Sequence, residues 1–160
     1  MDDNGELTGL DPGQLAAWIA LIKLAAAIVA RADGELRRNH GITGSDYELL
    51  HHLSERDEGQ RISDLARVID DSSSCITHRV NRLAASGLVT KRAGSADRRS
   101  RLVALTPEGR ALLAEAAPAH AARVQHWVVE PLTRRDLADL TRVATKLNRH
   151  LRNLEPEPRL

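Results

Sequence analysis

Apolar residues recur every three or four positions over long stretches of the chain, which is the spacing of helices buried along one face. The first such stretch carries its apolar positions at Leu15, Trp18, Ile22, Ala25, Ile28, Val29, Ala32 and Leu36. Asp11 is placed to cap this helix, Pro12 to occupy its first position and Gly41 to end it. Further apolar residues widen the stripe at Ile19, Leu21, Leu24 and Ala26. We therefore expect part of this helix to contact a second chain.

Three shorter helical patterns follow. Thr43 or Ser45 can cap "GSDYELLHHLSERD", and Glu48 is available to complete a capping box from Ser45. "ISDLARVID" is a shorter helix with Ser63 near its start. "DSSSCITHRVNRLAASG" begins with capping serines and ends at Gly87, a residue suited to a left-handed helix end. The last two helices, joined by a brief polar turn, have the pattern of a helix-turn-helix.

From Leu88 to Thr106 the apolar spacing changes from the helical period towards two. "LVTKR" and "RLVALT", separated by the polar "AGSADRRS", predict a β-hairpin with a long tip. Thr106, Pro107 and Glu108 then supply a cap, a first helical residue and a favourable charge for the next helix. The chain is therefore predicted to be mainly α, with a small β-hairpin beside the helix-turn-helix.

Two helical patterns complete the chain. The one that starts at Pro107 should end before Pro131 and be kinked or interrupted near Pro118. Thr133 can cap the last helix, which carries its apolar side at Leu137, Leu140, Val143, Ala144, Leu147 and Leu151.

Composition narrows the class of protein. The chain has 160 residues, 42% of them hydrophobic, which is enough for one domain or two small interlocked lobes. Its single cysteine, Cys75, excludes an internal disulfide and fits a reducing cytoplasm. The acidic N-terminus is unlike a targeting leader, and no apolar run reaches the roughly 18 residues that span a bilayer. We expect a cytoplasmic protein without a membrane partner.

Positive charge is concentrated in one segment. From Ser72 to Arg101 the chain has seven Lys and Arg residues against one acid, a net charge of +6, whereas the whole chain carries +1. The remainder therefore carries −5. This asymmetry is typical of a phosphate-binding face on an otherwise acidic protein.

The serine-led helix of this segment has two different faces. If Ile76, Val80 and Leu83 face the core, a rotation of about 100° per residue places polar side chains on the opposite side. The outward residues are Ser74, His78, Asn81, Arg82 and Ala85, with Thr77 and Arg79 at the borders. Such hydroxyl, imidazole, amide and guanidinium groups read base edges and hold phosphates. The alternative is the solvated polar face that any surface helix shows.

The hairpin tip favours DNA. Arg98 and Arg99 stand at the tip of a hairpin that directly follows a helix-turn-helix, which is the winged-helix arrangement. Such a wing reaches the minor groove, where negative potential is enhanced. Asp97 is placed to accept hydrogen bonds from a neighbouring arginine and fix its direction. A solvated charge run is again the alternative.

These segments together resemble a known family. "ISDLARVIDDSSSCITHRVNRLAASGLV" and "GLVTKRAGSADRRSRLVALTPEGRALL" are similar to the MarR family of bacterial transcription regulators, over about residues 15–151. The resemblance implies an obligate homodimer whose first and last two helices interlock and whose two lobes bind pseudo-palindromic double-stranded DNA, most often as a repressor. It implies a helical dimerisation region at residues 11–38 and 107–152. A winged helix-turn-helix lobe occupies residues 43–106, and flexible tails occupy residues 1–10 and 153–160.

The resemblance also assigns residues to the DNA contact. The family's wing motif, Asp-x-Arg, falls on Asp97 and Arg99, and its recognition-helix contacts fall on Ser73, Ser74, Thr77, His78 and Arg82. The residue pattern adds Asn81, Lys91, Arg92 and Arg98 to the predicted DNA-binding set. The chain departs from the family at Cys75, where Thr or Ala is frequent, and at the acidic pair Asp70 and Asp71, where Gly-Val is frequent.

A small-molecule effector is a further implication. Many family members release DNA when a small, often aromatic or phenolic anion enters the cleft between the dimer helices and the DNA-binding lobe. Trp18, Tyr47, His51 and Arg56 are the candidates to line such a cleft. For Trp18 and Tyr47 the alternative is ordinary core packing.

Other chemistry has less support. Cys75 near a helix start could act as a redox switch, but we favour the interpretation that it is a small packed thiol. The histidines do not pair on one helical face, so we expect no metal site and no cofactor. The chain contains no nucleophile elbow or phosphate-binding loop, so we expect no enzyme. The alternative to a regulator is an architectural DNA protein that tolerates any sequence.

Overall fold

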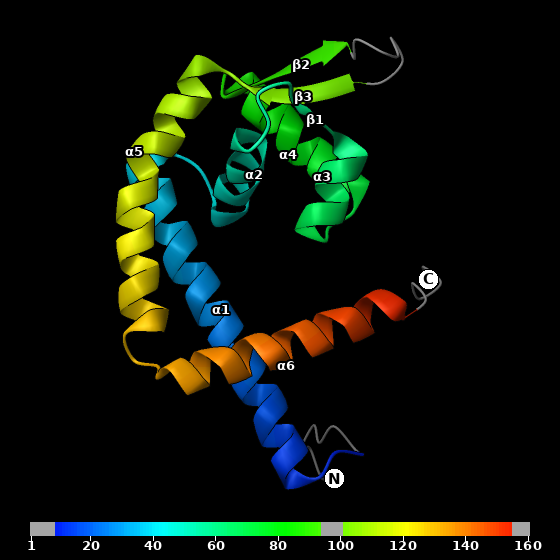
Figure 1. Cartoon of the computed structure of the whole chain (residues 1–160), viewed down its shortest axis with the longest axis vertical. Helices are drawn as coiled ribbons and strands as arrows, with labels where there is room; N and C mark the ends of the chain where they lie inside the picture. Colours follow the sequence, from blue (N-terminus) through cyan, green and yellow to red (C-terminus); the bar gives the residue numbers. More distant parts are fainter. Residues whose placement is uncertain (1–8, 94–100, 155–160) are drawn as a thin grey trace, which may run out of the picture. The chain divides into compact units, whose positions relative to one another are not determined.

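A computed structural model of the chain describes residues 9–93 and 101–154 (Figure 1). The described part is mainly helical with a small antiparallel sheet, which confirms the predicted fold class. Its elements, in chain order, are α1 Pro12–His40, α2 Gly44–Ser54, β1 Gln60–Arg61, α3 Ile62–Ile69, α4 Ser73–Ala85, β2 Val89–Ala93, β3 Arg101–Leu105, α5 Pro107–Val124, the π-helix η1 Gln125–Val129 and α6 Arg134–Asn153. The chain forms two compact units, Met1–Pro118 and Ala119–Leu160.

Helix α1 starts and ends where the sequence predicts. The Asp11 carboxylate accepts the backbone N–H of Gln14 at 2.9 Å, and the Gln14 side chain accepts the N–H of Asp11 at 3.0 Å. At the other end, Gly41 adopts φ 70° and donates its N–H to the carbonyl of Arg37. Glycine adopts this left-handed conformation without the steric cost that a Cβ would add.

Most apolar residues of α1 are exposed in the part of the chain that the structure describes. Only Glu35 and Leu36 of this helix are buried, whereas Trp18 is 48% exposed. By length and composition α1 is also apolar enough to cross a membrane, so the expectation that no run suffices is wrong. The physical reason is that Lys23 alone interrupts the apolar run from Leu15 to Ala30. Core helices of water-soluble proteins meet the same criterion.

Helix α2 is capped by Thr43 rather than Ser45. The Thr43 hydroxyl accepts the N–H of Asp46 at 3.1 Å, and the Asp46 carboxylate accepts the N–H of Thr43 at 2.9 Å. Of the two caps that the sequence allowed, the box between Ser45 and Glu48 is therefore wrong. The acid three residues after Thr43 completes the box just as Glu48 would have done for Ser45.

The lobe formed by α2, α3, α4 and the sheet is built around leucine, isoleucine and valine. Ile76, Val80 and Leu83 of α4 are buried, as the helical spacing predicts. They pack in one cluster with leucines of α2 and α3 and with β3, whose members include Leu49, Leu50, Leu53, Leu65, Val103 and Leu105. This packing turns the opposite side of α4 towards solvent.

The sheet has a strand that the sequence did not predict. β2 pairs with β3 in the expected hairpin, and β1 pairs with the other edge of β3 through Gln60 opposite Val103. A two-residue strand is too short to show an alternating pattern. Gly59, just before β1, has φ 89°, and a Cβ there would lie 2.7 Å from the carbonyl oxygen of Val103. Only glycine lets the backbone approach β3 this closely.

Helix α5 begins at the predicted cap, where the Thr106 hydroxyl accepts the N–H of Gly109 at 3.0 Å. Pro118 lies inside the helix, which continues to Val124, so of the two outcomes expected there the interruption is wrong. The kink stays a prediction. The helical period changes only at η1, before Pro131 as predicted. In the second unit, Thr133 caps α6 through a box with Asp136. Of the apolar residues of α6, Leu137 is half-buried, whereas Leu140, Val143, Leu147 and Leu151 are exposed.

Candidate nucleic-acid interface

The outward face of α4 carries the polar residues that the helical spacing placed there. Ser73, Ser74, His78, Asn81 and Arg82 are exposed, opposite the buried side of the helix. The start of α4 is capped by Ser72, whose hydroxyl accepts the N–H of Cys75 at 3.2 Å. Hydroxyl, imidazole and amide groups are thus presented together on one exposed helical surface of the lobe.

Thr77 is less available than this group. It is half-buried, and its hydroxyl donates to the Ser73 carbonyl at 2.7 Å within α4. The hydroxyl hydrogen is therefore already used inside the helix, and only the oxygen can accept a further bond.

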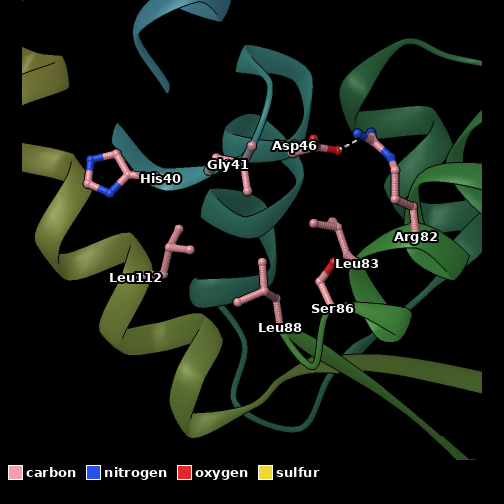
Figure 2. Close-up of a pocket in the computed structure, with 9 residues that line it drawn as sticks. His40, Gly41, Asp46, Arg82, Leu83, Ser86, Leu88 and Leu112 are labelled. Atoms are coloured by element: carbon pink, nitrogen blue, oxygen red, sulfur yellow. Dashed lines mark hydrogen bonds and ion pairs between the residues drawn. The ribbon is translucent and has the colours of Figure 1, made fainter. Parts of the chain in front are cut away.

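Arg82 forms an ion pair with a buried acid, Asp46. Its Nη2 lies 2.6 Å from Oδ1 of Asp46, whose side chain is only 1% exposed, while 45% of the Arg82 side chain remains exposed. Figure 2 shows the guanidinium of Arg82 reaching from α4 to Asp46 at the start of α2. The sequence assigned Arg82 to DNA alone, but the structure gives it a second partner 36 positions away. A buried carboxylate needs such a counterion.

Arg79 is also paired within the lobe. Its Nη2 lies 2.5 Å from Oδ2 of Asp71, with the two side chains 16% and 25% exposed. The other oxygen of Asp71 accepts the N–H of Ser72 at 2.6 Å. The acidic residue that departs from the family pattern therefore closes the turn before α4 and has its charge compensated.

These two ion pairs compensate part of the positive charge that was counted around α4. The count from Ser72 to Arg101 included Arg79 and Arg82 but left out Asp46 and Asp71, which precede the segment. Because each arginine faces an acid, the basic character of the lobe near α4 depends more on Lys91 and Arg92 of β2, both exposed. The sequence reasoning missed Asp46, and it named Asp71 only as a departure from the family pattern.

Lys91 and Asn81 connect the hairpin to α4. The Lys91 ammonium donates to Oδ1 of Asn81, so the strand β2 and the helix α4 share a direct polar contact. The predicted wing residues Asp97, Arg98 and Arg99 lie outside the described residues. β2 and β3 are paired as far as Ala93 opposite Arg101. These two residues are therefore the last described ones on either side of the predicted tip.

The four predicted effector residues do not come together within the chain. Tyr47 and His51 stack, with ring centroids 6.4 Å apart and planes 4° from parallel. Trp18 lies 15 residues before Asp33, whose carboxylate accepts the N–H of Gly44 at the start of α2. At about 1.5 Å per residue, Trp18 is therefore about 22 Å away along the helix axis from that contact. Arg56 is exposed in the turn after α2.

A cavity of about 380 Å³ lies elsewhere in the lobe (Figure 2). It opens between the end of α1, the start of α2, the end of α4 and α5, and its lining is His40, Gly41, Ile42, Asp46, Arg82, Leu83, Ser86, Leu88 and Leu112. Its walls combine leucines with the ion pair between Arg82 and Asp46. Because the lining comes from distant parts of the chain, no local pattern in the sequence indicated it.

Among the described residues, the side chains of Tyr47, His120 and Asp136 have shifted pKa values. Burial raises the pKa of Tyr47, so its phenol stays protonated and can donate a hydrogen bond. Burial lowers the pKa of His120, which favours its neutral form. The hydrogen bonds from the Thr133 hydroxyl and backbone lower the pKa of Asp136 at the start of α6.

The remaining candidates from the sequence were a reactive cysteine and a metal site. Cys75 is half-buried in the first turn of α4. Across residues 9–93 and 101–154, no group of three or more histidine, cysteine or acidic side chains is placed to hold a metal ion.

Comparison with known proteins identifies the lobe. Residues 42–109 match the family described as winged helix DNA-binding domain. A search of curated proteins finds no match. The solved structure of AbsC, a MarR family transcriptional regulator from Streptomyces coelicolor, is 30% identical to this chain, with a TM-score of 0.84. That match covers 91% of this chain and 98% of AbsC.

Two further structures extend the comparison. A second MarR family transcriptional regulator from Streptomyces coelicolor, solved in complex with DNA, is 27% identical over 96% of this chain and 95% of its own, with a TM-score of 0.85. CouR from Rhodococcus jostii RHA1, solved with p-coumaroyl-CoA, shares the fold at 22% identity and a TM-score of 0.71, over 81% of this chain and 89% of CouR. The chain belongs to the MarR family of transcriptional regulators, which are DNA-binding proteins and not enzymes.

Proposed function

We propose that the protein is a homodimeric repressor that binds a pseudo-palindromic operator in double-stranded DNA and releases it when a small ligand binds. The observation that carries the DNA-binding part is the exposed polar face of α4, held beside the basic strand β2. In a dimer, the two copies of α4 would address half-sites about one helical turn apart in neighbouring major grooves.

The exposed apolar surface supports the homodimer. On α1, Trp18, Ile19, Leu21, Ile22, Leu24 and Val29 are each at least 40% exposed. On α6, Leu140, Val143, Leu147 and Leu151 are likewise exposed. Monomeric proteins in water rarely leave so many large apolar side chains uncovered. A second copy of the chain would cover these helices without requiring a membrane, in keeping with a cytoplasmic protein.

The DNA contact is proposed to use two groups of residues. Residues on α4 would read base edges and nearby phosphates: Ser73, Ser74, Thr77, His78, Asn81 and Arg82. Lys91 and Arg92 of β2 and the predicted tip residues Arg98 and Arg99 would bring positive charge to the phosphates and the minor groove. Asp97 would orient a neighbouring arginine of the tip. Arg82 would use the part of its guanidinium that does not face Asp46.

The effector has two candidate places. One is the surface near Tyr47, His51 and Arg56, which in a dimer could be completed by Trp18 of α1. The other is the cavity beside Arg82, where a small organic acid would have a cation and apolar walls around it. Occupation of the cavity would act directly on the contact between α4 and Asp46, and so on the helix that we propose meets the DNA.

The experiment that tests DNA binding starts from selection of bound fragments from the source genome. The best fragment and a random duplex of equal length are then compared by fluorescence anisotropy at several salt concentrations. A sequence-specific regulator binds its operator at least about 10³-fold more tightly than random DNA. Equal affinities would favour the architectural alternative instead. Sedimentation of the complex should give two chains per operator.

The effector is tested by two variants that separate the two places. Small aromatic acids are screened for release of the operator, and the best is titrated against Leu112→Trp, which fills the cavity, and Tyr47→Ala, which opens the α2 surface. Loss of the response in only one variant assigns the place. Release by peroxide that disappears in Cys75→Ser would support the redox alternative instead.

A further inference from the structure

The contact between Lys91 and Asn81 joins the wing strand β2 to the helix α4 across the proposed DNA face. We propose that Lys91 is a positioning residue that fixes the amide of Asn81 so that the operator is read as guanine at one position of each half-site. This inference rests on the proposed function, because it assigns a base preference to the same DNA-binding surface.

The strand directs Lys91 towards α4. Val89 and Lys91 are two residues apart on β2 and therefore point to the same face of the sheet. Val89 is buried in the core with α4, whereas Lys91 is exposed one step further along the strand. Its ammonium therefore extends past the edge of the core to Asn81 on the exposed side of α4. Arg92, the next residue along β2, points to the opposite face.

The chemistry of the two side chains determines the orientation of the amide. An ammonium group only donates hydrogen bonds, so the atom of Asn81 that faces Lys91 must be the carbonyl oxygen Oδ1. The amide nitrogen Nδ2 then points away from Lys91, with two hydrogens to donate. Among the described residues, no contact of this nitrogen with the protein competes for those hydrogens.

This orientation favours guanine over adenine. A free asparagine typically pairs with adenine, accepting from N6 through Oδ1 while donating to N7. Here Oδ1 already faces a cation, and the positive charge of Lys91 opposes the amino hydrogens of adenine or cytosine. Guanine presents two acceptors, N7 and O6, in the major groove. The Nδ2 hydrogens and the nearby ammonium both favour that edge.

The test uses the full-length protein and its selected operator, in which each position of the half-site is changed to the other three bases. The wild type should prefer guanine at one position, and Asn81→Ala should lose that preference. Lys91→Met should reduce the preference for guanine over adenine at that position by about tenfold, the value of one good base contact. Lys91→Arg, which can still donate to Oδ1, should retain most of it.

Arg92→Met is the matched control, because it removes a neighbouring cation that points to the other face of β2. It should weaken binding to every sequence alike and lower the slope of log affinity against log salt by about 1. If Lys91→Met gives this same uniform loss and leaves the base preference intact, Lys91 is a plain phosphate contact and the inference is wrong. A preference for adenine in the wild type would also overturn it.

Folding and the proposed function are checked in the same series. Circular dichroism melting curves of the variants should match the wild type, since both side chains are exposed. A wild type that binds every duplex equally would overturn the proposed function and this inference with it. A wild type with a clear operator and no effect of Asn81→Ala on base preference would overturn this inference alone.

Discussion

Removing either partner of the ion pair between Asp46 and Arg82 should destabilise the protein, but by different amounts. Asp46 is almost completely buried, and its carboxylate is held by Arg82 at 2.6 Å and by the backbone N–H of Thr43 at 2.9 Å. Nearly half of the Arg82 side chain is in solvent. Arg82→Met leaves a buried carboxylate with only the Thr43 N–H, whereas Asp46→Asn leaves an arginine that water can solvate.

The magnitudes follow from this asymmetry. Loss of one partner from a buried pair typically costs about 3–5 kcal/mol, and the remaining bond from Thr43 places Arg82→Met near about 3 kcal/mol. A hydrogen bond to a charged group is worth about 1.5–3 kcal/mol. Because solvent screens the exposed end of Arg82, we expect Asp46→Asn to cost about 1–2 kcal/mol. The double variant should cost less than the sum, since the two side chains interact directly.

Urea unfolding followed by circular dichroism at neutral pH measures these free energies. All variants must be compared at one protein concentration, because the proposed association of two chains would contribute to the apparent stability. Arg82→Lys is a useful control, since it keeps the charge while losing the planar geometry of the guanidinium. If both single variants cost less than about 0.5 kcal/mol, the pair is an ordinary surface contact and the reasoning fails.

Four further changes test other parts of the account. Gly59→Ala should lower the free energy of unfolding by about 2 kcal/mol or more, because its Cβ would meet the carbonyl of Val103, and an unchanged urea midpoint would contradict this. Asp70 has φ 62°, so Asp70→Gly should be more stable than Asp70→Ala by about 1 kcal/mol in thermal unfolding, and the reverse order would refute the strain. Ile22→Glu should convert the proposed dimer to monomer in sedimentation, since it charges the exposed stripe of α1; a dimer that persists would place the interface elsewhere. Arg99→Ala should weaken operator binding by about 1–3 kcal/mol in gel-shift titrations, and unchanged affinity would reject the wing assignment.

Local signals in the sequence predicted the elements well. Capping residues such as Asp11 and Thr133 are recognised from a few neighbouring positions, and the structure confirms both. The buried side of α4 followed from helical spacing alone. By contrast, β1 has two residues and carries no period, so its pairing with β3 depends on contacts that the sequence does not display.

The site was predicted less completely than the fold. The exposure of the polar face of α4 follows from the helical spacing, but the ion pairs of Arg79 and Arg82 do not. Asp46 and Arg82 meet only because α2 and α4 pack on the same core, 36 positions apart. The pattern Thr43-x-x-Asp46 did offer a signal for a capping acid, and it was available in the sequence. The net charge of the segment from Ser72 to Arg101 therefore overestimated the number of cationic side chains that are available to bind DNA.

The salt dependence of binding to the selected operator and to random DNA tests the central claim most directly. If α4 and the wing of a dimer meet the duplex together, operator affinity should exceed random affinity by at least about 10³-fold near physiological salt. Both affinities should fall steeply as salt rises, because phosphate contacts release counterions. Equal affinity for the two duplexes, or binding that does not respond to salt, would contradict the account.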